Sequence, residues 1–239
     1  MGSSGPAAAC GFMPSIVPSL LAGDFARLGK SLDVVQALGI LAVHIDVIDG
    51  HFRPQISVGQ PVVRSIRKAT RLKLDVHLMI ERSERYIEDF VKAGADSLAL
   101  QLEAVQDAAF AISSARKLGT KTGVAVNTTT PLETCYELLE DIDYVLVETG
   151  GEGIMPRSLM RITALARERA NRGLNFNIGA EGEFGAVEAC DLLSAGADIL
   201  VVDSAIFDKK ERGEAMRSLA RELSQKPPAS GQEMDPHVC

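Results

Sequence analysis

The chain has 239 residues, of which 46% are hydrophobic, and this is enough apolar sequence for one large core in a single domain. Charged residues make up 24% of the sequence and the formal net charge is −7. No basic patch stands out, so nucleic acid and membrane surfaces are not expected as partners. No apolar run reaches the ~18 residues that span a bilayer, and residues 1–12 lack the features of a signal peptide. We therefore expect a cytoplasmic protein.

The two ends of the sequence differ from its middle. Residues 1–14 are expected to form a disordered tail, and so are residues 225–239, which contain the polar run KPPASGQEMDPHVC. Residues 15–224 are then the folded domain.

Short apolar runs rich in β-branched residues recur through this domain about every 25–30 residues, the length of one β/α unit. Amphipathic stretches with helical spacing separate them. One is 26–39, which Gly39 is expected to close, and another is 82–96, for which Ser83 is the expected N-cap. The predicted strands are 15–21, 41–46, 72–79, 97–102, 121–127, 144–149, 175–181 and 198–204.

Eight alternations of strand and helix predict a parallel sheet with crossover helices, an α/β fold. Two Ala-Gly-Ala-Asp segments, 93–96 and 195–198, are expected to end a helix just before a strand, because glycine readily adopts the left-handed cap. No G-x-G-x-x-G sequence follows the first strand, which argues against a doubly wound open sheet. We therefore predict a (β/α)8 TIM barrel.

Polar residues at the C-terminal ends of the strands are candidates for the active site of such a barrel. His44 and Asp46 are two positions apart, so they face the same side of a strand, and His77 ends the next one. These groups are costly to bury without partners, and a shared divalent cation would satisfy them. The alternative is that both histidines are hydrogen-bonded fillers of the barrel. Two histidines and two carboxylates suit Zn²⁺ first, with Mn²⁺, Fe²⁺ or Co²⁺ as alternatives.

Several stretches resemble the ribulose-phosphate 3-epimerase family, and the resemblance runs from Ser15 to Phe207. The combination of H-x-D-x-x-D-G-x-F-x-P with a following D-V-H-L-M is its most specific part. The resemblance implies a barrel of the ribulose-phosphate-binding type that interconverts ribulose 5-phosphate and xylulose 5-phosphate. The stretches are VPSLLAGDFARL, VHIDVIDGHFRPQISVG, LDVHLMI, KAGAD and AGADILVVDSAIF.

The resemblance also implies site residues. One divalent metal would be held by His44, Asp46, His77 and Glu181, with Asp46 and Glu181 acting as catalytic acid and base on opposite faces of a planar enediolate. A small-molecule sugar or sugar phosphate is the expected partner, and we also expect a homo-oligomer. The residues implied to bind substrate are Ser19, Met79, Gly153, Gly182 and Ser204.

The sequence departs from the family pattern in the site. The family's Asp-Gly-Gly after strand seven is Glu181-Gly182-Glu183 here, and its Gly-Ser after strand eight is Asp203-Ser204. Backbone N–H groups of these loops bind phosphate in such barrels. Like charges ~4 Å apart at an effective dielectric near 20 cost about 4 kcal/mol, so weak phosphate binding is expected. Only Arg53 and Arg157 are candidates to compensate.

Glu148 replaces a family methionine at the end of strand six. We expect it to be either a fifth metal ligand or a carboxylate hydrogen-bonded to a ligand. The alternative is an outward-facing glutamate.

Three functions remain open from the sequence. The first is a metal-dependent sugar-phosphate 3-epimerase, favoured by the intact histidines, Asp46 and Ser19. The second is an epimerase or isomerase of an unphosphorylated or differently substituted sugar, and the third is a non-catalytic barrel relative with a binding role; the altered phosphate loops favour both. A Schiff-base aldolase is disfavoured because Lys73 and Lys121 lie at strand starts.

Overall fold

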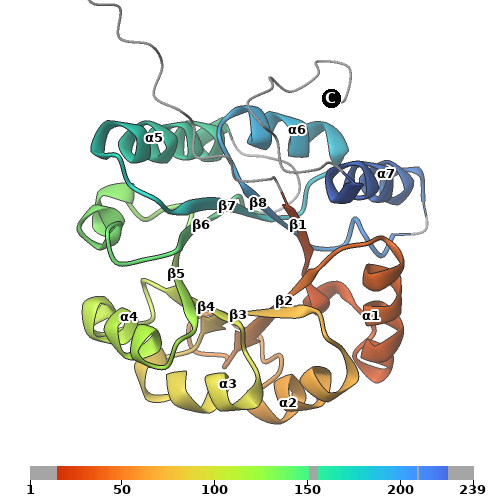
Figure 1. The fold of residues 1–239 in the computed structure, drawn as a ribbon, viewed down its shortest axis with the longest axis horizontal. Helices are drawn as coiled ribbons and strands as arrows, with labels where there is room; N and C mark the ends of the chain where they lie inside the picture. The colour runs from red at the N-terminus through yellow and green to blue at the C-terminus, as the bar shows by residue number, and fades with distance from the viewer. Residues whose placement is uncertain (1–14, 151–155, 209, 226–239) are drawn as a thin grey trace, which may run out of the picture.

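The computed structural model describes residues 15–150, 156–208 and 210–225, and its eight strands form a ring surrounded by helices (Figure 1). All pairings between neighbouring strands are parallel, in the order β1-β8-β7-β6-β5-β4-β3-β2, and an isolated parallel bridge from Ser19 to His44 joins β1 to β2. The predicted (β/α)8 barrel is confirmed. The strands are β1 Ser15–Pro18, β2 Ala42–Ile48, β3 Lys73–Met79, β4 Ser97–Gln101, β5 Lys121–Val126, β6 Tyr144–Glu148, β7 Asn177–Gly182 and β8 Ile199–Val202.

Helices follow the strands, as the sequence pattern predicts. Between β5 and β6 the connection contains the 3-10 helix η4 (Leu132–Leu138). Shorter 3-10 turns, η1 Leu20–Ala22 and η2 Phe25–Arg27, precede α1. None of the helices in the described part of the chain is long and apolar enough to cross a membrane. The α-helices are α1 Leu28–Ala37, α2 Gln60–Ala69, α3 Ile87–Ala93, α4 Ala108–Lys117, α5 Pro156–Arg172, α6 Ala186–Ser194 and α7 Glu211–Gln225.

The helix ends agree with the sequence at the glycines and differ at Ser83. Gly39, Gly94 and Gly196 all have positive φ, of 74°, 111° and 109°, as expected for residues that end helices. Ser83 is not the N-cap of α3. The chain turns at left-handed Arg82, Ser83 opens the 3-10 helix η3 (Ser83–Arg85), and α3 begins four residues after Ser83. The tails predicted at 1–14 and 225–239 lie outside the described residues, apart from Gln225.

Aspartates just before three of the even-numbered strands hold the N-terminal end of the barrel. Asp96, Asp143 and Asp198 precede β4, β6 and β8, and the carboxylate of each accepts a hydrogen bond at 2.8–2.9 Å from a backbone N–H of the strand before. The N–H of each aspartate donates to the carbonyl oxygen of the same partner residue at 2.7–2.9 Å. This explains the aspartate of both Ala-Gly-Ala-Asp segments: it fixes the register of the strand it enters against its neighbour. These residues therefore stabilise the fold at the end opposite to the site.

The inside of the barrel is layered. Its apolar layer contains Val17, Ala99, Ala125, Leu146 and Val201, all buried. Because side chains two positions apart face the same way along a strand, the next inward residue on each of these strands lies one layer nearer the C-terminal end. That layer is polar. It contains Gln101 and Glu148 at the ends of β4 and β6, and Ser19, Asn127 and Asp203 directly after β1, β5 and β8.

Candidate metal and active site

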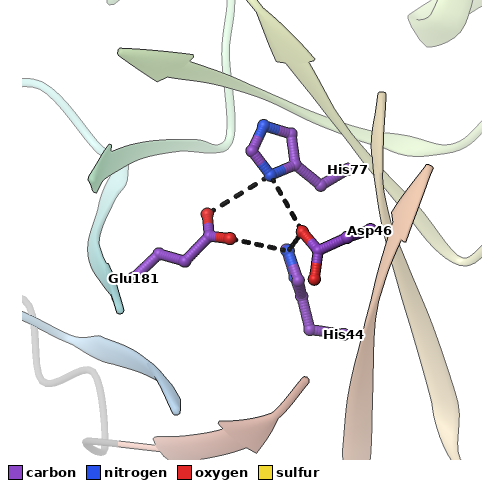
Figure 2. A group of neighbouring side chains, drawn as sticks. All are labelled: His44, Asp46, His77 and Glu181. Atoms are coloured by element: carbon purple, nitrogen blue, oxygen red, sulfur yellow. Dashed lines mark ion pairs between the residues drawn. The ribbon is translucent and has the colours of Figure 1, made fainter. Parts of the chain in front are cut away.

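Four side chains from three strands converge in this polar layer. His44 and Asp46 come from β2, His77 from β3 and Glu181 from β7, and Figure 2 shows all four pointing toward one another. Each offers one nitrogen or oxygen atom, and these atoms all lie within 4.8 Å of one another. The structure thus brings together the four residues that the sequence resemblance implies as ligands.

The distances among the candidate ligand atoms, with both oxygens of Glu181 included, suit a small divalent cation. His44 Nε2 lies 3.3 Å from Asp46 Oδ1 and 3.7 Å from Glu181 Oε1. His77 Nδ1 lies 3.5 Å from Asp46 Oδ1 and 3.2 Å from Glu181 Oε2. Four ligands at ~2.0–2.1 Å from a tetrahedral zinc ion would be about 3.3 Å apart. The cluster therefore needs little adjustment to hold such an ion.

Four of these atoms lack other partners within the described structure. His44 Nε2, Asp46 Oδ1, His77 Nδ1 and Glu181 Oε2 are all buried without a hydrogen bond. A buried polar atom without a partner costs about 1–3 kcal/mol, so four at one point call for a shared ligand. The donor set, two imidazoles and two carboxylates, fits a divalent metal.

The outer atoms of three of these side chains are hydrogen-bonded, which orients the inner atoms. Ser19 Oγ donates to Asp46 Oδ2 at 2.7 Å. His77 Nε2 is 2.7 Å from Gln101 Oε1, and the Gln101 amide nitrogen donates to Glu103 at 2.6 Å, so the amide oxygen faces the histidine. In the neutral imidazole, Nε2 therefore carries the proton, which leaves the lone pair of Nδ1 for a metal.

His44 is oriented by a carboxylate whose importance the sequence analysis missed. Its Nδ1 lies 2.7 Å from Asp75 Oδ2, so Nε2 points into the cluster. Asp75 also accepts hydrogen bonds from Ser97 Oγ at 2.5 Å and from Tyr144 OH at 2.6 Å. The available signal was that Asp75 shares a strand face with His77 and pairs in register with His44. Nothing in the local sequence points to Tyr144.

Without a metal, protons on the histidines balance the two carboxylates. Burial lowers the pKa of His77, but Glu181 and Asp46 outweigh it and raise the pKa to about 10. For His44 the same carboxylates likewise overcome burial and raise the pKa well above its usual value. Burial would raise the pKa of Asp46, yet His44 and His77 hold it well below its usual range. The site therefore favours bound positive charge, which a metal would supply in place of the protons.

Glu148 lies beside this cluster, in register with Glu181 on the adjacent strand. Its carboxyl group is buried and lies near enough to Glu181 and His77 to interact with their charges, so the outward-facing alternative is wrong. Its Oε2 accepts a 2.5 Å hydrogen bond from Arg53, in the loop after β2, and its Oε1 is buried without a partner. Burial and Glu181 raise the pKa of Glu148, opposed by Arg53. Its role as a fifth ligand or as a support for a ligand stays a prediction.

Carboxylates also line the loops after β7 and β8. Glu183 accepts hydrogen bonds from the backbone N–H and the hydroxyl of Ser204, at 3.0 and 2.7 Å. Burial and neighbouring carboxylates, Glu181 first, raise the pKa of Asp203 to about 7. Gly182 has a φ of 156°, and a Cβ there would lie 2.1 Å from Thr149 Oγ1, so a larger residue would not fit.

The other residues implied to contact substrate have different surroundings. Ser19 is fully buried and supports Asp46, and Met79 is buried at the end of β3. Gly153 lies outside the described residues. Contact of Ser19, Met79, Gly182 and Ser204 with a substrate stays a prediction.

Comparison with known proteins identifies the family. Residues 15–207 match the Ribulose-phosphate 3 epimerase family. The chain belongs to this family. Curated relatives named ribulose-phosphate 3-epimerase include one from Treponema pallidum, 39% identical over 81% of this chain and 91% of the relative. Another, from Bacillus subtilis, is 36% identical over 87% of this chain and 98% of the relative.

Solved structures with a similar fold are more distant in sequence. A 3-keto-L-gulonate-6-phosphate decarboxylase from Vibrio cholerae matches with a TM-score of 0.65 at 14% identity, covering 89% of this chain and 97% of that one. A tryptophan synthase α-subunit mutant from Pyrococcus furiosus matches with a TM-score of 0.62 at 17% identity, covering 88% and 96%. These structures support the barrel fold alone.

Proposed function

We propose that this protein is a metal-dependent 3-epimerase that inverts C3 of a ketose or ketose phosphate of the ribulose 5-phosphate type. One observation carries the proposal: two carboxylates reach a common point from opposite sides, beside two histidines with free nitrogen atoms (Figure 2). Inversion of a carbon next to a ketone needs such a pair. Family membership and the names of the relatives support the same reaction.

The two carboxylates have complementary roles in this proposal. Asp46 takes the C3 proton from one face of the sugar, and Glu181 gives a proton to the opposite face of the planar enediolate. The reverse reaction exchanges their roles, so no atom is gained or lost overall. His44 and His77 hold the pKa of Asp46 well below its usual range, so its carboxylate is ionised. Ser19 holds the Asp46 carboxylate in place through its second oxygen.

We propose zinc as the metal, held by His44, Asp46, His77 and Glu181. The nitrogen and oxygen donors and their separations of 3.2–3.7 Å support this choice, with Mn²⁺, Fe²⁺ and Co²⁺ as alternatives. When bound, a metal at this point would polarise the substrate carbonyl and stabilise the charge of the enediolate. A sugar or sugar phosphate partner, a homo-oligomer and a cytoplasmic location stay predictions.

The test is exchange of the C3 proton with deuterated water, measured by NMR on zinc-loaded protein. The substrates are ribulose and xylulose, each with and without a 5-phosphate. We expect wild type to exchange the proton and to interconvert the epimers of at least one pair. Asp46→Asn and Glu181→Gln should each abolish interconversion, because inversion needs both groups.

A single remaining carboxylate can still remove a proton from its own face. Each variant that retains zinc should therefore exchange the proton of one epimer only, without inversion, and the two variants should differ in which epimer they exchange. Zinc content is measured for each, and Glu222→Gln, an exposed change on α7, is the matched control. Absence of exchange with every ketose in zinc-loaded wild type would refute the epimerase proposal.

A further inference from the structure

Backbone N–H groups after β7 and β8 are the usual place where barrels of this kind bind a phosphate group. In this chain, its own carboxylates already bind N–H groups of both loops. After β8, Ser204 donates its N–H and its hydroxyl to Glu183. After β7, Gly185, just before α6, donates its N–H to Glu188 Oε2 at 2.9 Å.

Glu183 binds the two hydrogen-bond donors of Ser204 in the way that a bound anion would. Its two oxygens take the two donors separately, Oε2 from the backbone N–H at 3.0 Å and Oε1 from the hydroxyl at 2.7 Å. A substrate phosphate would need these same donors. It would have to displace Glu183, and the displaced carboxylate would remain attached two residues after Glu181 and repel the dianion.

Charged side chains around Ser204 further oppose the binding of a phosphate group. Asp203 immediately precedes Ser204, and burial raises its pKa, as do nearby carboxylates, Glu181 first and Glu183 among them. A phosphate dianion bound here would add to the repulsion among these carboxylates. Arg53, one of the two arginines that could have compensated, is paired with Glu148 instead.

We propose that Glu183 is a built-in substitute for a substrate phosphate, and that the ketose epimerised here carries an uncharged hydroxyl group at this end. The inference rests on the proposed 3-epimerase function and narrows its substrate class. A carboxylate accepts hydrogen bonds and sugar hydroxyls donate them, so Glu183 suits the end of an unphosphorylated sugar. Asp203 beside it can accept a hydrogen bond from such a hydroxyl or, when protonated, donate one.

The first arm of the test measures binding of inorganic phosphate by calorimetry. It compares zinc-loaded wild type, Glu183→Ala and the matched control Glu222→Ala, which removes an exposed charge from α7. Phosphate that binds to zinc contributes equally in all three, so a difference reports the loops after β7 and β8. We expect Glu183→Ala to bind phosphate roughly tenfold or more tightly than wild type, a change of about 1.4 kcal/mol. The control should match wild type.

Equal phosphate affinity in wild type and Glu183→Ala would overturn the inference, whether both bind or neither does. Circular dichroism checks that each variant is folded. If Glu183→Ala does not fold, Glu183→Gln takes its place, because it keeps the side-chain size and removes only the charge; a smaller gain in phosphate affinity is then expected.

The second arm measures C3 proton exchange with ribulose and with ribulose 5-phosphate. Wild type should have the higher kcat/KM for ribulose, and Glu183→Ala should shift the ratio toward the phosphate by roughly tenfold. A wild-type preference for ribulose 5-phosphate, or an unchanged ratio in the variant, would overturn the inference. No exchange with any ketose would count against the epimerase function itself, while the calorimetry would still decide the role of Glu183.

Discussion

At the scale of single residues, the candidate metal site depends on side chains that do not face the metal position. Asp75 is the clearest example, because it accepts hydrogen bonds from His44, Ser97 and Tyr144. Although burial would raise its pKa, these partners, His44 first, lower it, so Asp75 is ionised beside the histidine. A carboxylate in this position fixes the histidine ring and makes it a stronger ligand.

We predict that Asp75→Asn lowers zinc affinity by about 10–100-fold, because asparagine lacks the charge that supports His44. Zinc affinity is measured by competition with a chromophoric chelator. Asp33→Asn, an exposed change on α1, serves as the matched control and should leave affinity unaltered. A folded Asp75→Asn protein with wild-type zinc affinity would contradict the assigned role of Asp75.

At the scale of elements, β5 and β6 support the site from the far side of the barrel. Tyr144 begins β6, and its ring lies over Gly123 of β5, where a Cβ would come within 2.6 Å of three ring atoms. Its hydroxyl then reaches Asp75 on β3 at 2.6 Å. The absence of a side chain at Gly123 therefore lets a residue of β6 stabilise a histidine of β2 through Asp75.

We predict that Gly123→Ala destabilises the protein by about 1–3 kcal/mol, because the added methyl group overpacks the barrel interior. It should also lower zinc affinity, since Tyr144 has to move away from Asp75. Urea unfolding and chelator competition measure the two effects. Gly29→Ala is the control: it lies in α1 with nothing within 4 Å of the added Cβ, so it should be neutral or slightly stabilising. Equal stability of the two variants would contradict the prediction.

At the scale of the whole molecule, the site links strands on both sides of the place where the ring closes. β1 and β2 are joined through the Ser19–His44 bridge, and the four candidate ligands come from β2, β3 and β7. Across the barrel mouth, the Arg53–Glu148 ion pair connects the loop after β2 to β6, four strands away in the ring. A ligand bound by the four residues is therefore expected to stabilise the complete barrel.

We predict that zinc raises the melting temperature more at pH 7.5 than at pH 5.5. At free zinc 100 times Kd the stabilisation is about 2.7 kcal/mol, equivalent to several degrees for this chain length. Protons on His44 and His77 compete with zinc, and a lower pH strengthens that competition. In the metal-free protein the dependence of stability on pH is opposite. The folded state favours protonated His77 and raises its pKa to about 10, so this contribution to stability is complete below pH ~6.5 and is lost as the pH rises through 10.

Scanning calorimetry with zinc and with a chelator at both pH values checks this prediction. A zinc-induced rise that is equal at pH 5.5 and 7.5 would show that these histidines do not bind the metal. His77→Ala should lose most of the zinc effect, since a ligand is removed.

The sequence by itself predicted the barrel, and the family resemblance named the side chains that converge in it. The β/α repeat predicts the strand positions, and the two-residue spacing of His44 and Asp46 places both inside the ring, where strand order brings them to His77 and Glu181. It also predicted acidic residues in the loops after β7 and β8. These features follow from local periodicity and from a family pattern.

Only the tertiary structure decided which partners these side chains bind. Tyr144 reaches Asp75 across 69 residues of sequence, Arg53 reaches Glu148 across 95, and Glu183 binds Ser204 across 21. Periodicity tells which face of a strand a side chain occupies, but its partner depends on which distant side chain the closed barrel brings within hydrogen-bond distance. Glu183 therefore appeared in the sequence as a charge that repels phosphate, and in the structure as the acceptor of two hydrogen bonds from Ser204.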